Sequence, residues 1–94
     1  MEGQARLQLS LHGRVQGVGF RWWARQQAQV LGCTGYARND PSGERVEIVA
    51  EGSRNTLEEL LKMLSQGPPG AYISHVETEW QDSTGEFDQF QIRR

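Results

Sequence analysis

The sequence predicts an α+β domain in which two helices cover one face of a mostly antiparallel sheet. Three observations support this prediction. Strand and helix patterns follow one another in the order β-α-β-β-α-β, each helix has a single apolar stripe, and turn residues separate the elements. The chain has 94 residues, the length of one domain, and we assign all of residues 1–94 to it.

The first part of the pattern contains a strand, a helix and a second strand. Three leucines between residues 7 and 11 alternate with polar residues, which indicates a half-buried strand. Apolar side chains then recur on one helical face over residues 20–31, and Gly32 ends this pattern. A short strand is expected at residues 34–38.

The middle of the chain contains the clearest helix. Turn residues at positions 40–43 lead into a third strand at 46–50. Four leucines between residues 57 and 64 then form one helical stripe, which a Gly-Pro-Pro sequence ends. Either Ser53 or Asn55 can cap the start of this helix, and Asn55 has a glutamate three residues later to complete a capping box.

Two strands complete the pattern, one at residues 72–81 and one that contains Phe90 and Ile92. Both helices can bury their stripes on the same face of one sheet, which is the ferredoxin-like α/β sandwich. The first two strands are joined through a helix and therefore run parallel, so their C-terminal ends lie at the same edge of the sheet. We expect Asn39, at the end of the second strand, to lie near the loop that follows the first.

This loop is the most informative segment of the chain. Residues 13–21 read Gly-Arg-Val-Gln-Gly-Val-Gly-Phe-Arg, in which Gly17 and Gly19 can adopt a positive φ and turn backbone N–H groups toward one point. The helix that follows adds its unpaired N-terminal N–H groups and the positive end of its dipole. Arg21 adds a planar cation suited to tetrahedral oxyanions. The loop therefore predicts a binding site for one small phosphate-like anion.

The charge of the chain is unevenly distributed. Residues 3–39 contain five arginines and no acidic residue, whereas residues 40–94 contain eleven acidic and five basic residues. With a net charge of −2, this asymmetry favours a small anionic ligand over a nucleic acid, which usually meets a broad basic surface. An accidental run of arginines is the alternative interpretation.

The composition also indicates where the protein works. No apolar run approaches the roughly 20 residues that cross a bilayer, and the N-terminal residues lack the apolar segment of a signal peptide. Cys33 is the only cysteine, so an internal disulfide is impossible. We therefore expect a cytoplasmic protein without a membrane partner.

The sequence lacks the residues that several kinds of phosphate-binding or catalytic site require. The loop ends in Phe20 and Arg21, where an ATP-binding loop has a lysine and a hydroxyl residue, and its glycines do not fit the dinucleotide fingerprint. No metal-ligand spacing or Ser-His-acid set accompanies the loop. Asn39 can hold a water in line with a bound phosphoryl group. Because a carboxamide is a poor base, the substrate must already be reactive, as acyl phosphates are.

Two segments resemble the signature motifs of the acylphosphatase family. Residues 13–21 resemble the first motif, and residues 35–39 with Gly43 and Val46 resemble the second. The resemblance extends over essentially the whole chain. Two residues stand between Gly43 and Val46 where the family usually has one, and we expect the extra residue to widen the turn while leaving Asn39 in place.

The resemblance implies hydrolysis of the carboxyl–phosphate bond by a monomer, with no metal and no cofactor. It implies that Arg21 binds the phosphate and that Asn39 orients the attacking water. Small acyl phosphates such as acetyl phosphate, carbamoyl phosphate or a phosphorylated glycerate are the implied substrates. The backbone amides implied to bind the phosphate are those of Val15, Gln16, Gly17, Val18, Gly19 and Phe20.

A second class of function stays open, because the same fold hosts binding and regulatory modules. One example is a catalytically idle phosphate-binding or docking module, like the acylphosphatase-like domain of hydrogenase maturation factors. Such a module would have the loop but would not hydrolyse a substrate. We expect the side chain of Gln16 to shape the loop, and Arg14 and Arg38 to be solvated or steering charges rather than direct ligands. The two histidines are expected at the surface, and Trp22 is expected to point away from the core.

Overall fold

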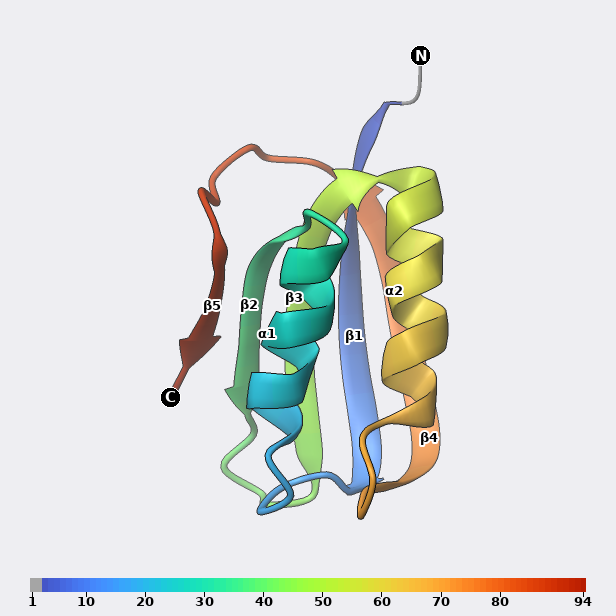
Figure 1. Cartoon of the computed structure of the whole chain (residues 1–94), viewed down its shortest axis with the longest axis vertical. Coiled ribbons are helices and arrows are strands. Elements are labelled where there is room, and N and C mark those ends of the chain that lie inside the picture. Colours follow the sequence, from blue (N-terminus) through green and yellow to red (C-terminus); the bar gives the residue numbers. More distant parts are fainter. Residues whose placement is uncertain (1–2) are drawn as a thin grey trace.

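The computed structural model describes residues 3–94 as a five-stranded sheet with both helices on one of its faces (Figure 1). The predicted α+β class and the predicted order of the first six elements are confirmed. Met1 and Glu2, which we assign to the same domain, lie outside the described residues. The elements in chain order are β1 (Gln4–Arg14), α1 (Phe20–Val30), β2 (Thr34–Asn39), β3 (Arg45–Ser53), α2 (Arg54–Gln66), β4 (Tyr72–Asp82) and β5 (Phe90–Arg93).

The strands lie in the order β4-β1-β3-β2-β5. Neighbouring strands are antiparallel except for β2 and β5, which pair in parallel. Because β1 and β2 both run antiparallel to β3, they run parallel to each other, as predicted. Their C-terminal ends therefore meet at one edge of the sheet, where the β1–α1 loop lies beside the β2–β3 turn at the lower end of Figure 1.

The core lies between the sheet and the two helices. Each helix buries the apolar stripe that the sequence predicts, and the inward-facing residues of β1 and β3 complete the packing. Within residues 3–94, neither helix is long and apolar enough to cross a membrane. The largest fully buried side chains are those of Phe20, Leu7, Leu9, Leu11, Ile48, Leu57, Leu60, Leu64, Val15 and Val46.

The helix ends show which of the predicted residues begin and end the helices. The Ser53 hydroxyl accepts a hydrogen bond from the Thr56 backbone N–H at 3.2 Å, so Ser53 caps α2. The alternative cap at Asn55 is wrong, because Asn55 already lies inside the first turn. At the end of α1, Gly32 has a φ of 74° and the Cys33 N–H bonds the Ala28 carbonyl at 2.9 Å, which closes the helix as expected.

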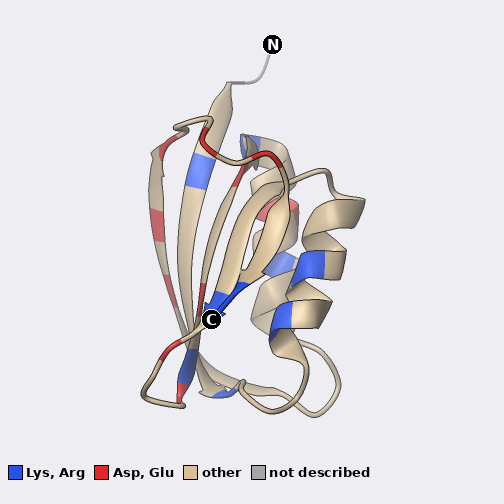
Figure 2. Cartoon of the chain, turned by 90° about the vertical axis from the view of Figure 1, so that its left-hand side faces the viewer, with Lys and Arg blue, Asp and Glu red and all other residues tan. Residues whose placement is uncertain are grey.

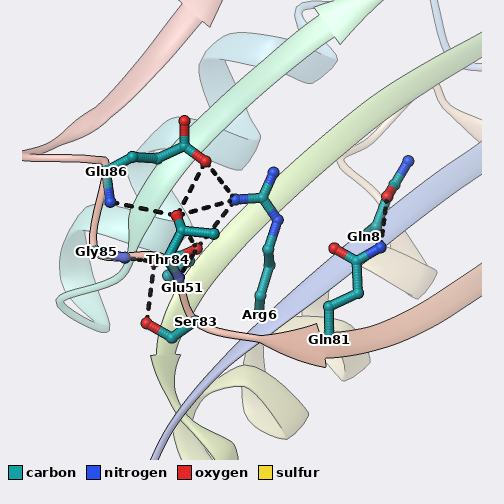
Figure 3. A network of polar contacts seen from close by, with 8 residues as sticks. All are labelled: Arg6, Gln8, Glu51, Gln81, Ser83, Thr84, Gly85 and Glu86. Atoms are coloured by element: carbon teal, nitrogen blue, oxygen red, sulfur yellow. Dashed lines mark hydrogen bonds and ion pairs between the residues drawn. The ribbon is translucent and has the colours of Figure 1, made fainter.

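A buried carboxylate fixes the loop that leads into β5 (Figure 3). Glu51 of β3 is only 5% exposed, and it accepts hydrogen bonds from the backbone N–H groups of Thr84 and Gly85, both at 3.0 Å. The Arg6 guanidinium lies 3.0 Å from the same carboxylate and 2.7 Å from that of Glu86. These contacts hold the start of the β4–β5 connection against β1 and β3.

Candidate functional site

The β1–α1 loop has the backbone conformation that the sequence predicts. Gly17 and Gly19 have φ values of 77° and 73°, in the left-handed region that favours glycine. Gly19 is also the N-cap residue of α1, and no side chain caps this end of the helix. The first N–H groups of α1 therefore remain available to an anion.

The loop and the end of β2 enclose a cavity of about 210 Å³. Asn39 lies at this cavity together with Arg21, although the two residues belong to different elements. The volume is below the roughly 300 Å³ at which pockets for drug-sized ligands begin, so the cavity suits a small ligand. The lining residues are Val15, Gln16, Gly17, Gly19, Phe20, Arg21, Trp22 and Asn39.

Val18 and Trp22 are placed differently with respect to the cavity. The side chain of Val18 packs against the hydrophobic core and does not line the cavity, whereas the prediction for Val18 concerns its backbone amide and stays a prediction. Trp22 is 63% exposed and points away from the core as expected, but it also lines the cavity. Its position directly after Arg21 was the only sequence signal that could have placed it there.

Gln16 connects the loop to the β2–β3 turn. Its side-chain amide donates to the carbonyl oxygens of Asp40 at 2.8 Å and Arg45 at 2.9 Å. The side chain thus shapes the loop, as predicted, and holds it next to the end of β2. The neighbouring residue Asn39 stays in register with Val46 of β3.

The β2–β3 turn that follows Asn39 is held by hydrogen bonds of its own. The Asp40 carboxylate accepts hydrogen bonds from the Ser42 N–H at 2.9 Å and from Arg45 at 3.0 Å, and the Glu44 carbonyl accepts one from Gly13 at 3.0 Å. Hydrogen bonds from Ser42, followed by the contact with Arg45, lower the pKa of Asp40 to about 2. The turn is therefore ordered by its own contacts. That the extra residue widens the turn and leaves Asn39 in the family's place stays a prediction.

Arg21 is oriented by the last strand of the sheet. Its guanidinium donates a hydrogen bond to the backbone carbonyl of Arg93 at 3.0 Å. The same side chain lines both the cavity of the loop and a larger cavity of about 540 Å³ beside it. The sequence does not predict the role of Arg93, because this role depends on the parallel pairing of β5 with β2.

The region around the site is basic, as the excess of arginines in residues 3–39 predicts. Figure 2 shows basic residues on α1 and at the C-terminal end of β5 on the same side of the molecule, with acidic residues on the strands and the upper loop. Arg38, next to Asn39 in the sequence, pairs with Glu47 at 2.7 Å and does not line the cavity. Arg14 is exposed at the end of β1.

The other candidate reactive groups lie elsewhere. Cys33 is buried, and burial raises the pKa of its thiol to about 11, which disfavours the nucleophilic thiolate. His12 lies 2.8 Å from Glu77 of the neighbouring strand β4, at the surface position expected for it. Within residues 3–94, no three His, Cys, Asp or Glu side chains are placed to hold a metal ion.

Comparison with known proteins identifies the family. The family model described as Acylphosphatase matches residues 7–92. An acylphosphatase from Mycolicibacterium vanbaalenii is 51% identical over 79 residues, which cover 84% of this chain and 84% of that protein.

Solved structures agree with this match. The acylphosphatase from Bacillus subtilis superposes with a TM-score of 0.91 at 30% identity, covering 96% of this chain and 99% of that one. Full-length HypF, solved in a phosphate- and nucleotide-bound form, contains a similar region with a TM-score of 0.89 at 26% identity, covering all of this chain and 12% of HypF. The chain therefore belongs to the acylphosphatase family, a family of enzymes that hydrolyse acyl phosphates.

Proposed function

We propose that Arg21 and the backbone amides of the β1–α1 loop hold the phosphoryl group of a small acyl phosphate, and that Asn39 positions the attacking water. The observation that carries this proposal is the cavity at which Asn39 meets the loop and Arg21. The two elements approach only because β1 and β2 end at the same edge of the sheet.

The proposed step is a direct displacement at phosphorus. The water oxygen forms a bond to phosphorus while the bond between phosphorus and the carboxyl oxygen breaks, and the carboxylate leaves with the electron pair. One proton of the water passes to a phosphoryl oxygen, so the products are a carboxylate and inorganic phosphate. The weak basicity of Asn39 suffices because a carboxylate is a good leaving group.

In this mechanism, positive charge comes from the protein rather than from a metal ion. Arg21 and the amide donors at the start of α1 would neutralise the phosphoryl oxygens, the role that metal ions have in many other phosphoryl transfers. The support for this assignment is the orientation of Arg21 by the Arg93 carbonyl and the uncapped N-terminus of α1.

We also propose that the enzyme acts as a monomer in the cytoplasm. All the residues assigned to the site come from one chain, so a second copy is not needed to complete it. The single cysteine is buried and offers no thiol for an intermolecular disulfide.

Release of phosphate from synthetic benzoyl phosphate in the presence of EDTA tests the proposed mechanism. The wild-type protein should hydrolyse this substrate at the same rate with and without the chelator. The Asn39→Ala variant should bind phosphate but turn over slowly. A rate that falls in EDTA and returns on addition of a divalent cation would refute the metal-free mechanism.

A phosphate-binding module without turnover is the second candidate. The observation behind this alternative is the similarity to one region of full-length HypF, a protein solved in a phosphate- and nucleotide-bound form. Calorimetry with inorganic phosphate separates the two candidates when it is combined with the hydrolysis assay. A folded wild-type protein that binds phosphate but leaves benzoyl phosphate intact would be the binding module.

A further inference from the structure

We propose that the cavity beside the phosphate loop binds a second anionic group of the substrate. The enzyme would then prefer acyl phosphates whose acyl group itself carries a negative charge. This inference rests on the proposed function, because it assumes that the phosphoryl group occupies the loop.

The two cavities share two lining side chains. Arg21 and Trp22 line the loop cavity of about 210 Å³ and also the neighbouring cavity of about 540 Å³. The larger volume falls in the range of roughly 300–1,000 Å³ that small-molecule sites occupy. A substrate held by its phosphoryl group in the loop would therefore extend its acyl group past Arg21 into the larger cavity.

The larger cavity is strongly basic. Arg21, Arg25 and Arg94 line it, and none of its lining residues is acidic. Amide side chains of Gln89 and Gln91 supply further hydrogen-bonding groups. Such a lining favours an anion over a neutral acyl group.

The charge of Arg25 is not neutralised by the protein. Within residues 3–94, the arginines that pair with carboxylates are Arg6, Arg38, Arg45 and Arg54, and none of them lines this cavity. The Arg25 Nε atom is buried and has no hydrogen-bond partner among the described residues. Its guanidinium carbon lies 5.5 Å from the centre of the Trp22 ring, an aromatic contact that restrains the side chain beside the cavity.

The spacing of the two arginines indicates the size of the acyl group. Arg21 and Arg25 are four residues apart on α1, which places them on the same side of the helix, about 6 Å apart along its axis. An acyl chain of three or four carbons spans this distance. Of the three substrates that the family resemblance implies, only the phosphorylated glycerate carries a second anion, whereas acetyl and carbamoyl phosphate would leave Arg25 unpaired.

A matched pair of substrates tests the inference. Succinyl phosphate and butyryl phosphate have the same number of carbons, but only the first ends in a carboxylate. We expect the wild-type kcat/KM to be about tenfold higher for succinyl phosphate, the effect of one charge-assisted hydrogen bond at a partly open site. The Arg25→Gln variant should lower this ratio toward one, and Arg25→Lys should preserve part of it.

A control variant separates a local effect from a general loss of charge. Lys62→Gln removes one positive charge from the exposed face of α2, away from both cavities, and should leave the ratio unchanged. Equal kcat/KM values for the two substrates in the wild-type protein, or an equal change of the ratio in Lys62→Gln and Arg25→Gln, would overturn the proposed subsite.

A binding measurement distinguishes failure of the subsite from failure of the proposed hydrolysis. The stable phosphonates 5-phosphonopentanoate and pentylphosphonate differ only in a terminal carboxylate and need no turnover. Calorimetry should give a Kd about tenfold lower for 5-phosphonopentanoate, and Arg25→Gln should abolish the difference. If this preference is found but neither acyl phosphate is hydrolysed, the subsite stands and the catalytic proposal fails. Equal affinities would refute the subsite whether or not the protein is active.

Discussion

The residues of the candidate site have different proposed roles: one supplies positive charge, and others position groups. Arg21 supplies a permanent cation, and its direction is set by the carbonyl of Arg93. Asn39 supplies a neutral amide at the end of β2. The side chain of Gln16 holds the β1–α1 loop, which contains Gln16, next to the β2–β3 turn. This division predicts different kinetic effects for changes at the two proposed catalytic residues.

Replacing Asn39 by alanine should lower kcat by a factor on the order of 10² to 10³, by analogy with the loss of an oxyanion donor. KM should change little, because the amide is expected to hold the water rather than the phosphate. Steady-state hydrolysis of benzoyl phosphate measures both constants. Asn55→Ala, an exposed change on α2, is the matched control. Turnover of Asn39→Ala close to that of the wild type would remove the water-positioning role.

Replacing Arg21 by alanine should abolish measurable phosphate binding. Each charge-assisted hydrogen bond from the guanidinium should contribute about 1.5–3 kcal/mol to the binding free energy. Calorimetric titration with inorganic phosphate measures the loss, and circular dichroism verifies that the variant is folded. Retention of wild-type affinity in a folded Arg21→Ala protein would contradict the assignment.

At the scale of elements, the conformation of the β1–α1 loop is as important as its side chains. Gly19 has a positive φ and open space around the position of a Cβ atom, so a side chain there is opposed by the backbone and not by crowding. The same description applies to Gly32 at the other end of α1. The two glycines therefore form a matched pair at opposite ends of one helix.

Alanine at either glycine should destabilise the fold by about 1 kcal/mol, because both residues would be held in the left-handed region. Only Gly19→Ala should also weaken phosphate binding, since only this glycine lies at the cavity. Denaturant unfolding and phosphate titration of both variants measure the two effects. An equal loss of phosphate affinity in Gly32→Ala would show that the effect comes from stability alone.

The elements differ in how far the sequence predicts them. The stripes of α1 and α2 and the positive φ of Gly17 and Gly19 depend on local patterns, and these predictions are confirmed. The contact between Arg21 and Arg93 joins residues 72 positions apart and requires β5 to pair with β2. A short edge strand carries no sequence pattern that specifies its partner, so this part of the site appears only in the structure.

At the scale of the whole molecule, Glu51 links the stability of the sheet to the placement of β5. Burial alone would raise the pKa of Glu51, but hydrogen bonds from the backbone of Thr84 and Gly85 and from Arg6 outweigh burial and lower it to about 2. The ionised carboxylate is thus bound more favourably in the folded chain than in the unfolded one. No motif marks Glu51 in the sequence, because its partners come from β1 and from the β4–β5 connection.

The lowered pKa of Glu51 predicts an acid-sensitive contribution to stability. The usual pKa is 4.5 and the folded value is about 2, so the contribution is complete above pH 4.5 and is lost as the pH falls toward 2. The full difference corresponds to about 3 kcal/mol of unfolding free energy. Urea unfolding between pH 7 and pH 2 should show this loss in the wild type and a flatter profile in Glu51→Gln. Glu59→Gln, on the exposed face of α2, should follow the wild-type profile.

The hydrogen bond between Arg21 and the Arg93 carbonyl also has a practical consequence for handling the protein. Any segment joined after Arg94, whether an affinity tag or a fusion partner, begins close to Arg21, the arginine that is proposed to bind the phosphoryl group. β1 begins at Gln4, at the opposite end of the molecule from the glycine loop (Figure 1). Attachments for purification or surface immobilisation therefore belong at the amino-terminal side, where they leave the entrance for substrate clear.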